Sequence, residues 1–258
     1  MSTRMAVVGK GGAGKSLVAG TLARLLAQKG RRVLTLDSDL MPGLALSLGL
    51  GAFSGASLAG AVECDEQGRW HLRKKIGPVR AVEEFSIEAP DGVRHLQGGK
   101  LGAEGMAGIV GSVNGLYEVA RRVGKARRFA TWTILGDLPA GTRQVAYEWA
   151  PYADTFVLVV EPSWKSALTA SRIAKIIRSR PGATVAPVAN KVVDAEDVER
   201  IEAILEEKVA GAVPLDQSVR EAERLGVAVV DHDRRAPAVK ALLALVDHLC
   251  DSWPREGL

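Results

Sequence analysis

The first thirty residues constrain the fold of this chain more than any other stretch does. A short apolar run, Met5–Val8, is followed at once by Gly9-Lys10-Gly11-Gly12-Ala13-Gly14-Lys15-Ser16. The spacing G-x-x-x-x-G-K-[ST] is typical of a loop whose backbone N–H groups surround a phosphate chain at the positive end of a helix. Residues 16–29 then place their apolar side chains on one helical stripe, and Gly30 suits a left-handed helix end. The pattern predicts a strand, a phosphate-binding loop and a helix in succession.

The rest of the chain alternates strand-like and helical segments, which indicates an α/β fold with a mostly parallel sheet and helices on both faces. With 258 residues and 47% hydrophobic content, it can bury a full core as a single P-loop domain spanning residues 1–258. The expected strands are 4–8, 32–37, 93–97, 131–137, 155–161 and 184–189. The further helices expected are 116–123, 163–178, 195–208, 216–225 and 237–250. Segment 51–115 is less regular, with a hairpin expected around residues 90–92, and its role stays unassigned.

The phosphate loop itself supplies the first candidate site residues. In such loops the lysine neutralises the β- and γ-phosphate oxygens and the serine ligates Mg²⁺, so these roles are expected of Lys15 and Ser16. The cofactors expected are therefore ATP and Mg²⁺. The nucleotide contacts predicted from the loop are Gly9, Lys10, Gly11, Gly12, Ala13, Gly14, Lys15, Ser16 and Leu17.

Three aspartates end strand-like segments and complete the predicted metal site. Asp37 and Asp39 close one such segment, and Asp137 closes a later one. The carboxyl ends of parallel strands share one sheet edge, and an acid in the position of Asp137 commonly holds Mg²⁺ through water. Each acid alone is equally compatible with a helix cap or a solvated turn. Together with the loop they predict a magnesium site of Ser16, Asp37, Asp39 and Asp137.

A dinucleotide-binding fold is the strongest rival interpretation. Gly9, Gly11 and Gly14 also satisfy G-x-G-x-x-G, and Asp37 lies where such folds keep their ribose-binding acid. This alternative, an oxidoreductase, gives no function to Lys15, Asp39 or Asp137. The phosphate-loop interpretation is therefore favoured, with the oxidoreductase retained as a less favoured alternative.

The same motifs give the chain a resemblance to the deviant Walker A ATPases, the group that includes MinD, ParA and the nitrogenase iron protein. Residues 10–16 match K-G-G-x-G-K-[ST], and Asp137-Leu138-Pro139-Ala140-Gly141 resembles the D-x-P-A-G second switch of the group. Glu161-Pro162-Ser163 resembles its E-P-[ST] turn, and Asn190-Lys191 resembles its adenine-reading asparagine with the basic residue that follows. The resemblance runs over nearly the whole chain.

This resemblance implies an ATPase that forms a homodimer in the ATP state. Because positioning and charge neutralisation supply most of the catalysis in phosphoryl transfer, hydrolysis is expected to be slow until a partner protein completes the site. The resemblance also assigns Lys10 to the phosphates of the partner subunit, and it makes Asp39 the residue that positions the attacking water. Lys10, Lys15 and Asp39 are thus the implied catalytic residues. Asp37 would be a neighbour near the metal, and Asn190 and Lys191 would contact the base.

Within the group, the sequence is most similar to CooC-type ATPases, which help to insert nickel into carbon monoxide dehydrogenase. The matching stretches are residues 99–102, 159–163 and 190–192. CooC-type proteins carry a C-x-C metal pair before the helix expected at 116–123, whereas this chain reads Gly111-Ser112-Val113-Asn114 there. An accessory ATPase for a metalloenzyme or another client is the favoured role, and nickel delivery follows only weakly because the soft thiolate ligands are missing.

The sequence leaves alternatives open for the base of the nucleotide and for the class of partner. G proteins read guanine with N-K-x-D, but Val193 occupies the fourth place here and Asp194 comes one later, so ATP is favoured over GTP. A MinD- or ParA-like spatial organiser would need a surface to bind. The net charge of +4 and a basic cluster allow nucleic acid as a partner, although solvated helix ends explain such a cluster better. The cluster consists of Arg121, Arg122, Lys125, Arg127 and Arg128.

Targeting and metal-binding signals are sparse. No apolar run reaches the roughly 20 residues of a membrane-spanning helix, and residues 251–258 do not form a basic amphipathic helix. The N-terminus resembles an opening strand and not a secretory signal, so a cytoplasmic protein is expected. Cys64 and Cys250 lie outside any metal-ligand spacing, and the four histidines are scattered singly.

Overall fold

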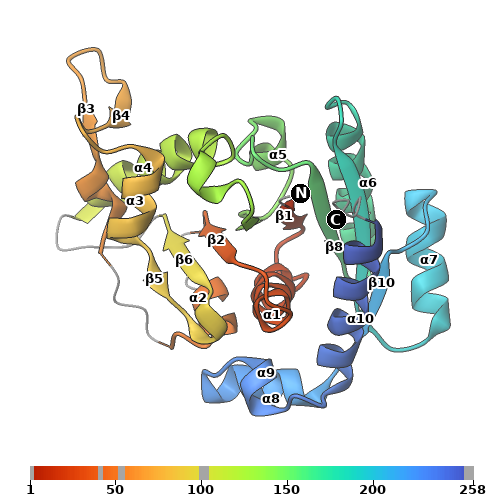
Figure 1. Cartoon of the computed structure of the whole chain (residues 1–258). Coiled ribbons are helices and arrows are strands. Elements are labelled where there is room, and N and C mark those ends of the chain that lie inside the picture. Colours follow the sequence, from red (N-terminus) through yellow and green to blue (C-terminus); the bar gives the residue numbers. More distant parts are fainter. Residues whose placement is uncertain (1–2, 40–42, 52–55, 99–104, 253–258) are drawn as a thin grey trace.

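A mostly parallel eight-stranded sheet forms the centre of the molecule (Figure 1). The computed structural model describes residues 3–39, 43–51, 56–98 and 105–252. The strand order is β10-β9-β8-β1-β7-β2-β6-β5, and only β5 runs antiparallel to its neighbour. A second, two-stranded sheet of β3 and β4 projects from the body. The strands are β1 Arg4–Gly9, β2 Val33–Asp37, β3 Val62–Cys64, β4 Trp70–Leu72, β5 Ile87–Glu88, β6 Arg94–Gln97, β7 Thr133–Asp137, β8 Thr155–Val160, β9 Thr184–Val192 and β10 Gly211–Pro214.

Helices cover both faces of the large sheet, and each face has its own apolar core. Helices α1, α2, α8, α9 and α10 pack on one face, and α3, α4, α6 and α7 on the other. The period of two along a strand produces this division, since Met5 and Val7 face the first core while Ala6 and Val8 face the second. The helices are α1 Lys15–Gln28, α2 Gly43–Ser47, α3 Pro78–Phe85, α4 Gly105–Val123, α5 Arg143–Ala146, α6 Trp164–Arg178, α7 Ala195–Leu205, α8 Gln217–Leu225, α9 Val229–His232 and α10 Pro237–Ser252, with 3₁₀ turns η1 Leu58–Ala61, η2 Pro90–Gly92 and η3 Arg127–Phe129.

The α/β fold expected from the sequence is confirmed, and so is the hairpin around residues 90–92, where η2 joins β5 to β6. The position of α4 differs from the expectation. Residues 111–114, expected before a helix, lie inside it. The apolar stripe of α4 is interrupted in the sequence, because Gly111 and Gly115 lie on its packed face and have no side chain to show the helical period. An added Cβ would lie 3.3 Å from the Ala59 side chain at Gly111 and 3.0 Å from the Leu58 carbonyl oxygen at Gly115.

Segment 51–115 contains more regular structure than its sequence indicated. Its described residues form η1, β3, β4, α3, β5, η2 and β6, and the first part of α4. These elements are short, so their hydrophobic periodicity is brief. Within the described ranges, no helix has the length and apolar character needed to cross a bilayer.

A nearly buried arginine joins α1 to three other segments. Arg24 is 3% exposed, and its guanidinium donates to both carboxylate oxygens of Asp231 in α9, at 2.9 and 2.8 Å. It also bonds to the carboxylate of Asp91 in η2 and to the carbonyl oxygen of Leu48. The bonds therefore hold α9, η2 and the end of α2 against the helix that follows the phosphate loop.

Replacing this arginine is expected to destabilise the protein strongly. Arg24→Ala removes a buried cation and leaves the Leu48 carbonyl without its donor, so we expect a loss of about 3 kcal/mol in the free energy of unfolding. Arg69→Ala is the matched control, because Arg69 forms a similar 2.8 Å pair with Asp65 but its side chain is 75% exposed. Urea denaturation should show less than about 1 kcal/mol for the control. Equal losses in the two variants would contradict a structural role for the Arg24 network.

Candidate functional site

The phosphate loop lies at the carboxyl edge of the sheet, at the end of its central strand β1. Strands β7 and β8 flank β1, and the chain leaves β1 through the loop directly into α1. Two glycines are required for this path. Gly9 has φ +153°, and a Cβ there would overlap the carbonyl oxygen of Val159. Gly14 has φ +94°, and a Cβ there would overlap the amide nitrogen of Asn190.

Lys15 and Ser16 begin α1 and point into the same region. The Lys15 Nζ atom lies 3.4 Å from the carbonyl oxygen of Lys10, across the loop. Burial lowers the pKa of Lys15, and the carboxylates of Asp137 and Asp39 oppose this shift. Ser16 Oγ donates to Asp137 Oδ2 at 2.6 Å. A lysine and a hydroxyl are thus placed next to a helix N-terminus, where phosphate oxygens bind well.

The three predicted acids come together because β2 and β7 are neighbours. Asp37 and Asp137 are direct partners in the parallel register of these strands. The backbone N–H of Asp39 donates to Asp37 Oδ1 at 3.0 Å. Ser38 tightens the arrangement, since its backbone N and its Oγ both donate to the Asp137 carbonyl oxygen, at 3.1 and 2.8 Å. The structure thus brings all three predicted acids to one edge beside Ser16.

Two of these carboxylates are buried and incompletely bonded. Asp37 and Asp137 are 0% and 1% exposed. Burial raises the pKa of Asp137 to about 6, and burial together with the charge of Asp137 raises that of Asp37 well above its ordinary value. Within the described residues, Asp37 Oδ2 and Asp137 Oδ1 have no hydrogen-bond partner. Buried carboxylates of this kind are stabilised by a cation.

The donor set fits Mg²⁺ better than a metal held by protein alone. In the part of the chain that the structure describes, no group of three or more histidine, cysteine, aspartate or glutamate residues has a geometry that could hold a metal. Magnesium commonly takes one or two protein oxygens and fills its remaining positions with phosphate and water oxygens. Ser16 and Asp137 could supply the protein oxygens of such a site.

A cavity of about 560 Å³ opens beside the loop and is large enough for a nucleotide. One wall consists of the loop glycines, Lys15, Ser16, Leu17 and Asp39, and another of Asn190 and Lys191. A third wall comes from the end of β10 and from α8, including Pro214, Leu215 and Arg220. Of the predicted charged site residues, Lys10, Asp37 and Asp137 do not line the cavity, although Asp137 is bonded to Ser16, which does.

Asn190 and Lys191 contact the loop directly. Asn190 is buried at the end of β9, and its Nδ2 donates to the Ala13 carbonyl oxygen at 2.7 Å. Lys191 has φ +63° and is the extra residue of a bulge, because Val213 pairs with Asn190 and Pro214 with Val192. The bulge directs Lys191 Nζ to the Gly12 carbonyl oxygen, at 2.6 Å.

Comparison with known proteins places this geometry in a family. A family model described as the CobQ/CobB/MinD/ParA nucleotide binding domain matches residues 5–230. The chain belongs to this family.

Two curated relatives and a solved structure resemble the chain over most of its length. It is 27% identical to the carbon monoxide dehydrogenase accessory protein CooC of Rhodospirillum rubrum, over 88% of this chain and 89% of the relative. It is 26% identical to an uncharacterized ATP-binding protein of Methanocaldococcus jannaschii, over 96% and 89%. The septum site-determining protein MinD of Pyrococcus horikoshii, solved with Mg-ADP, has the same fold, with a TM-score of 0.73, 20% identity and 96% coverage of both chains.

The residues that directly follow Lys191 place no acid at the cavity. Asp194 caps α7 and accepts a hydrogen bond from the backbone N of Asp197 at 3.0 Å. Val193 is 72% exposed. Neither residue lines the cavity.

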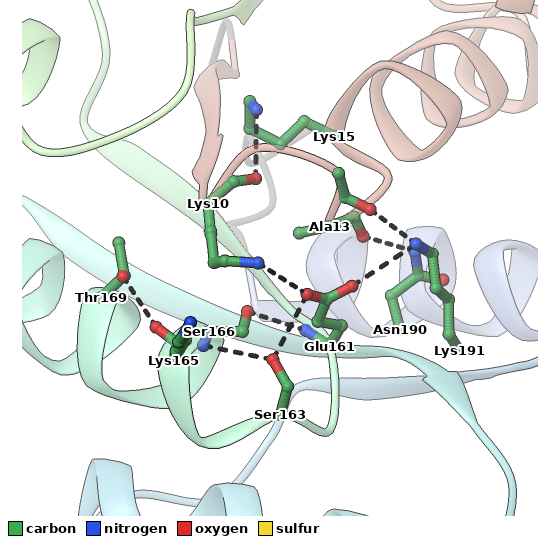
Figure 2. A network of polar contacts seen from close by, with 11 residues as sticks. Lys10, Ala13, Lys15, Glu161, Ser163, Lys165, Ser166, Thr169, Asn190 and Lys191 are labelled. Carbon is green, nitrogen blue, oxygen red and sulfur yellow. Dashed lines mark hydrogen bonds and ion pairs between the residues drawn. The ribbon is translucent and has the colours of Figure 1, made fainter.

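Sequence reasoning missed two parts of this candidate site. The first is the third cavity wall, because β10 is too short for a clear strand pattern; its signal is the Val213-Pro214 pair shortly before the helix cap Asp216. The second is Glu161, which the E-P-[ST] resemblance marked without giving it a role. Figure 2 shows its carboxylate between Lys10 and Lys191, and the Lys10 Nζ atom lies 3.0 Å from Glu161 Oε1.

Proposed function

We propose that this protein is an ATP-hydrolysing, nucleotide-switched dimer that acts on a partner protein. The observation that carries the proposal is the convergence of Lys15, Ser16 and Asp39 on a nucleotide-sized cavity, with the buried Asp137 bonded to Ser16. Membership of a nucleotide-binding family supports it. Hydrolysis in such a site serves a conformational change and makes no metabolic product.

Each residue of the candidate site would have its own role in phosphoryl transfer. Lys15 would neutralise the β- and γ-phosphates, while Ser16 and Asp137 would hold Mg²⁺, the latter partly through water. Asp37, which lies opposite Asp137 on the neighbouring strand, would add negative charge next to this metal site. Asp39, which lines the cavity, would orient the attacking water, and Lys10 would reach the phosphates of the other subunit. Positioning and charge neutralisation supply most of the rate in this reaction, so the turnover should be slow until a partner completes the site.

ATP is the nucleotide we propose. Asp194 is engaged as a helix cap, so it is not available to make the bidentate contact by which an acid reads guanine. Asn190 and Lys191 stand at the cavity wall where the base would lie. A dinucleotide cofactor fits worse, because the ribose hydroxyls need an accessible acid and Asp37 is fully buried.

The partner we propose is a client enzyme, as for an accessory factor in metalloenzyme maturation. Similarity to a carbon monoxide dehydrogenase accessory protein over most of both chains supports this role. A DNA- or surface-binding organiser is less well supported. Arg121 and Arg122 both pair with Glu118, at 3.3 and 2.6 Å, so the basic cluster is partly neutralised within the subunit. Residues 253–258, which bear on membrane docking, lie outside the described ranges.

The cross-subunit role of Lys10 gives the decisive experiment. Lys10→Ala should bind MgATP as a monomer yet fail to dimerise, because the γ-phosphate loses its cation from the second subunit. We expect the hydrolysis rate to fall at least about 100-fold. Sedimentation velocity with and without MgATP measures the dimer, and Lys208→Ala, an exposed lysine in α7's following loop, is the control. If Lys10→Ala dimerises and hydrolyses ATP like the wild type, the proposed switch is wrong.

A further inference from the structure

Glu161 is the common anion of two lysines beside the phosphate loop. Its Oε1 lies 3.0 Å from Lys10 Nζ, and its Oε2 lies 3.5 Å from Lys191 Nζ (Figure 2). The Glu161 side chain is 20% exposed, against 33% for Lys10 and 42% for Lys191. The carboxylate therefore neutralises the lysine to which the proposed function gives a role in the other subunit.

The position of the Glu161 carboxylate is fixed by the start of α6. Glu161 directly follows β8 and precedes Pro162. The Glu161 backbone N–H donates to Ser166 Oγ at 3.2 Å, and Ser163 Oγ donates to Glu161 Oε1 at 3.3 Å. Ser163 also caps α6 by accepting from the Ser166 backbone N–H. A carboxylate held in this way binds Lys10 without moving to meet it.

The charge state of Glu161 agrees with this arrangement. Burial acts to raise its pKa, but the hydrogen bond and charge of Lys10, together with Lys191, outweigh burial and keep the pKa below its ordinary value. Glu161 is therefore ionised at neutral pH, and Lys10 has to leave a charged partner before its ammonium can reach a second subunit.

We propose that Glu161 is a positioning residue that holds Lys10 within its own subunit, so that the Lys10–Glu161 ion pair sets the nucleotide concentration at which the dimer closes. This inference rests on the proposed function, since it needs Lys10 to act across the interface. ATP phosphates in the partner offer Lys10 a stronger anion, whereas a subunit facing an empty partner keeps the pair. The pair thus opposes dimerisation without nucleotide.

The expected size of the effect follows from the exposure of the pair. A partly exposed ion pair is worth a few-fold in an equilibrium constant, and a closed dimer has to break two of them. Removing the Glu161 charge should therefore raise the dimerisation constant about 10-fold.

The test is Glu161→Gln, followed by sedimentation velocity in a titration with MgATPγS, a slowly hydrolysed analogue. The half-point of dimerisation should shift to a concentration several-fold lower than in the wild type. Glu202→Gln is the matched control, because Glu202 pairs with Lys208 at 2.6 Å away from the cavity and the variant has the same net charge. Its half-point should equal that of the wild type.

A second measurement separates the ion pair from a general charge effect on the nucleotide. The Kd of MgATPγS is measured for Lys10→Ala and for Lys10→Ala/Glu161→Gln, where no Lys10–Glu161 pair exists. Glu161→Gln shifts the half-point of dimerisation relative to the wild type, and in the Lys10→Ala background it changes the Kd of MgATPγS. Our inference requires that the first change, in fold, exceed the second. An unchanged or higher half-point in Glu161→Gln, or a shift no larger than the change in Kd, would overturn the inference and leave the proposed function standing. Failure of the wild type itself to dimerise would overturn both.

Discussion

Lys15→Ala should abolish the stabilisation of this protein by MgATP. At a nucleotide concentration about 100 times Kd, a bound ligand adds about 2.7 kcal/mol, which corresponds to a rise of about 5–10 °C in Tm for a chain of this size. Lys15 is 8% exposed and its Nζ atom lies 3.4 Å from the carbonyl oxygen of Lys10, across the loop, whereas the ammonium groups of Lys10 and Lys191 are paired with Glu161. We expect the rise in Tm to disappear and ATP hydrolysis to fall at least about 100-fold.

Differential scanning fluorimetry with MgATP, MgGTP and NADH measures this effect. Lys29→Ala is the control, because Lys29 follows the other end of the same helix and pairs with Asp247 in α10. Its rise in Tm should match that of the wild type. A full MgATP response in Lys15→Ala would remove the loop as the nucleotide site, and stabilisation of the wild type by NADH alone would favour the oxidoreductase interpretation.

Asp137→Asn should stabilise the ligand-free protein and at the same time abolish its response to Mg²⁺. The folded-state pKa of Asp137 is about 6, against an ordinary value of 3.8. The folded protein therefore holds this proton more tightly than the unfolded chain does, and the wild type loses stability as the pH rises from about 4 to about 6. A difference of about two pKa units corresponds to about 3 kcal/mol. Asparagine carries no charge to bury, so at pH 7 and above the variant should retain the free energy of unfolding that the wild type loses.

Urea denaturation at several pH values tests the stability half of this prediction. The two proteins should be similarly stable below about pH 4 and should diverge above it, with Asp137→Asn the more stable. MgATP should stabilise only the wild type, because the amide offers Mg²⁺ a neutral oxygen in place of a carboxylate. Asp247→Asn, at a carboxylate that is 54% exposed, should follow the wild type in both measurements. A loss of stability in ligand-free Asp137→Asn at pH 8 would show that the carboxylate acts mainly as a structural acceptor for Ser16.

The candidate site is energetically unfavourable without a ligand. Buried carboxylates and a buried lysine lower the stability of the ligand-free protein, and the proposed magnesium nucleotide would supply the missing charges. Ligand binding and stability are therefore linked through Asp137 and Lys15.

Local sequence patterns determined a large part of this protein. The spacing of residues 9–16 fixes a phosphate loop because glycines are needed where φ is positive and where backbones approach closely, as at Gly9 and Gly14. Long periodic segments such as α1, α6 and α10 show their buried stripes directly. The α/β class and the P-loop follow from these signals alone.

Tertiary structure decided the features that depend on which segments become neighbours. The pairing of Asp37 with Asp137 across 100 residues follows from the strand order, which no local pattern specifies. Glycine-rich α4 is helical because it packs closely on η1 and the β3–β4 hairpin, although its own propensity is poor. The bulge at Lys191 likewise requires the register of β9 and β10, and the meeting of Glu161 with Lys10 requires that of β1 and β8. Local sequence records helix and turn preferences, whereas contacts between distant segments exist only once the whole sheet has assembled.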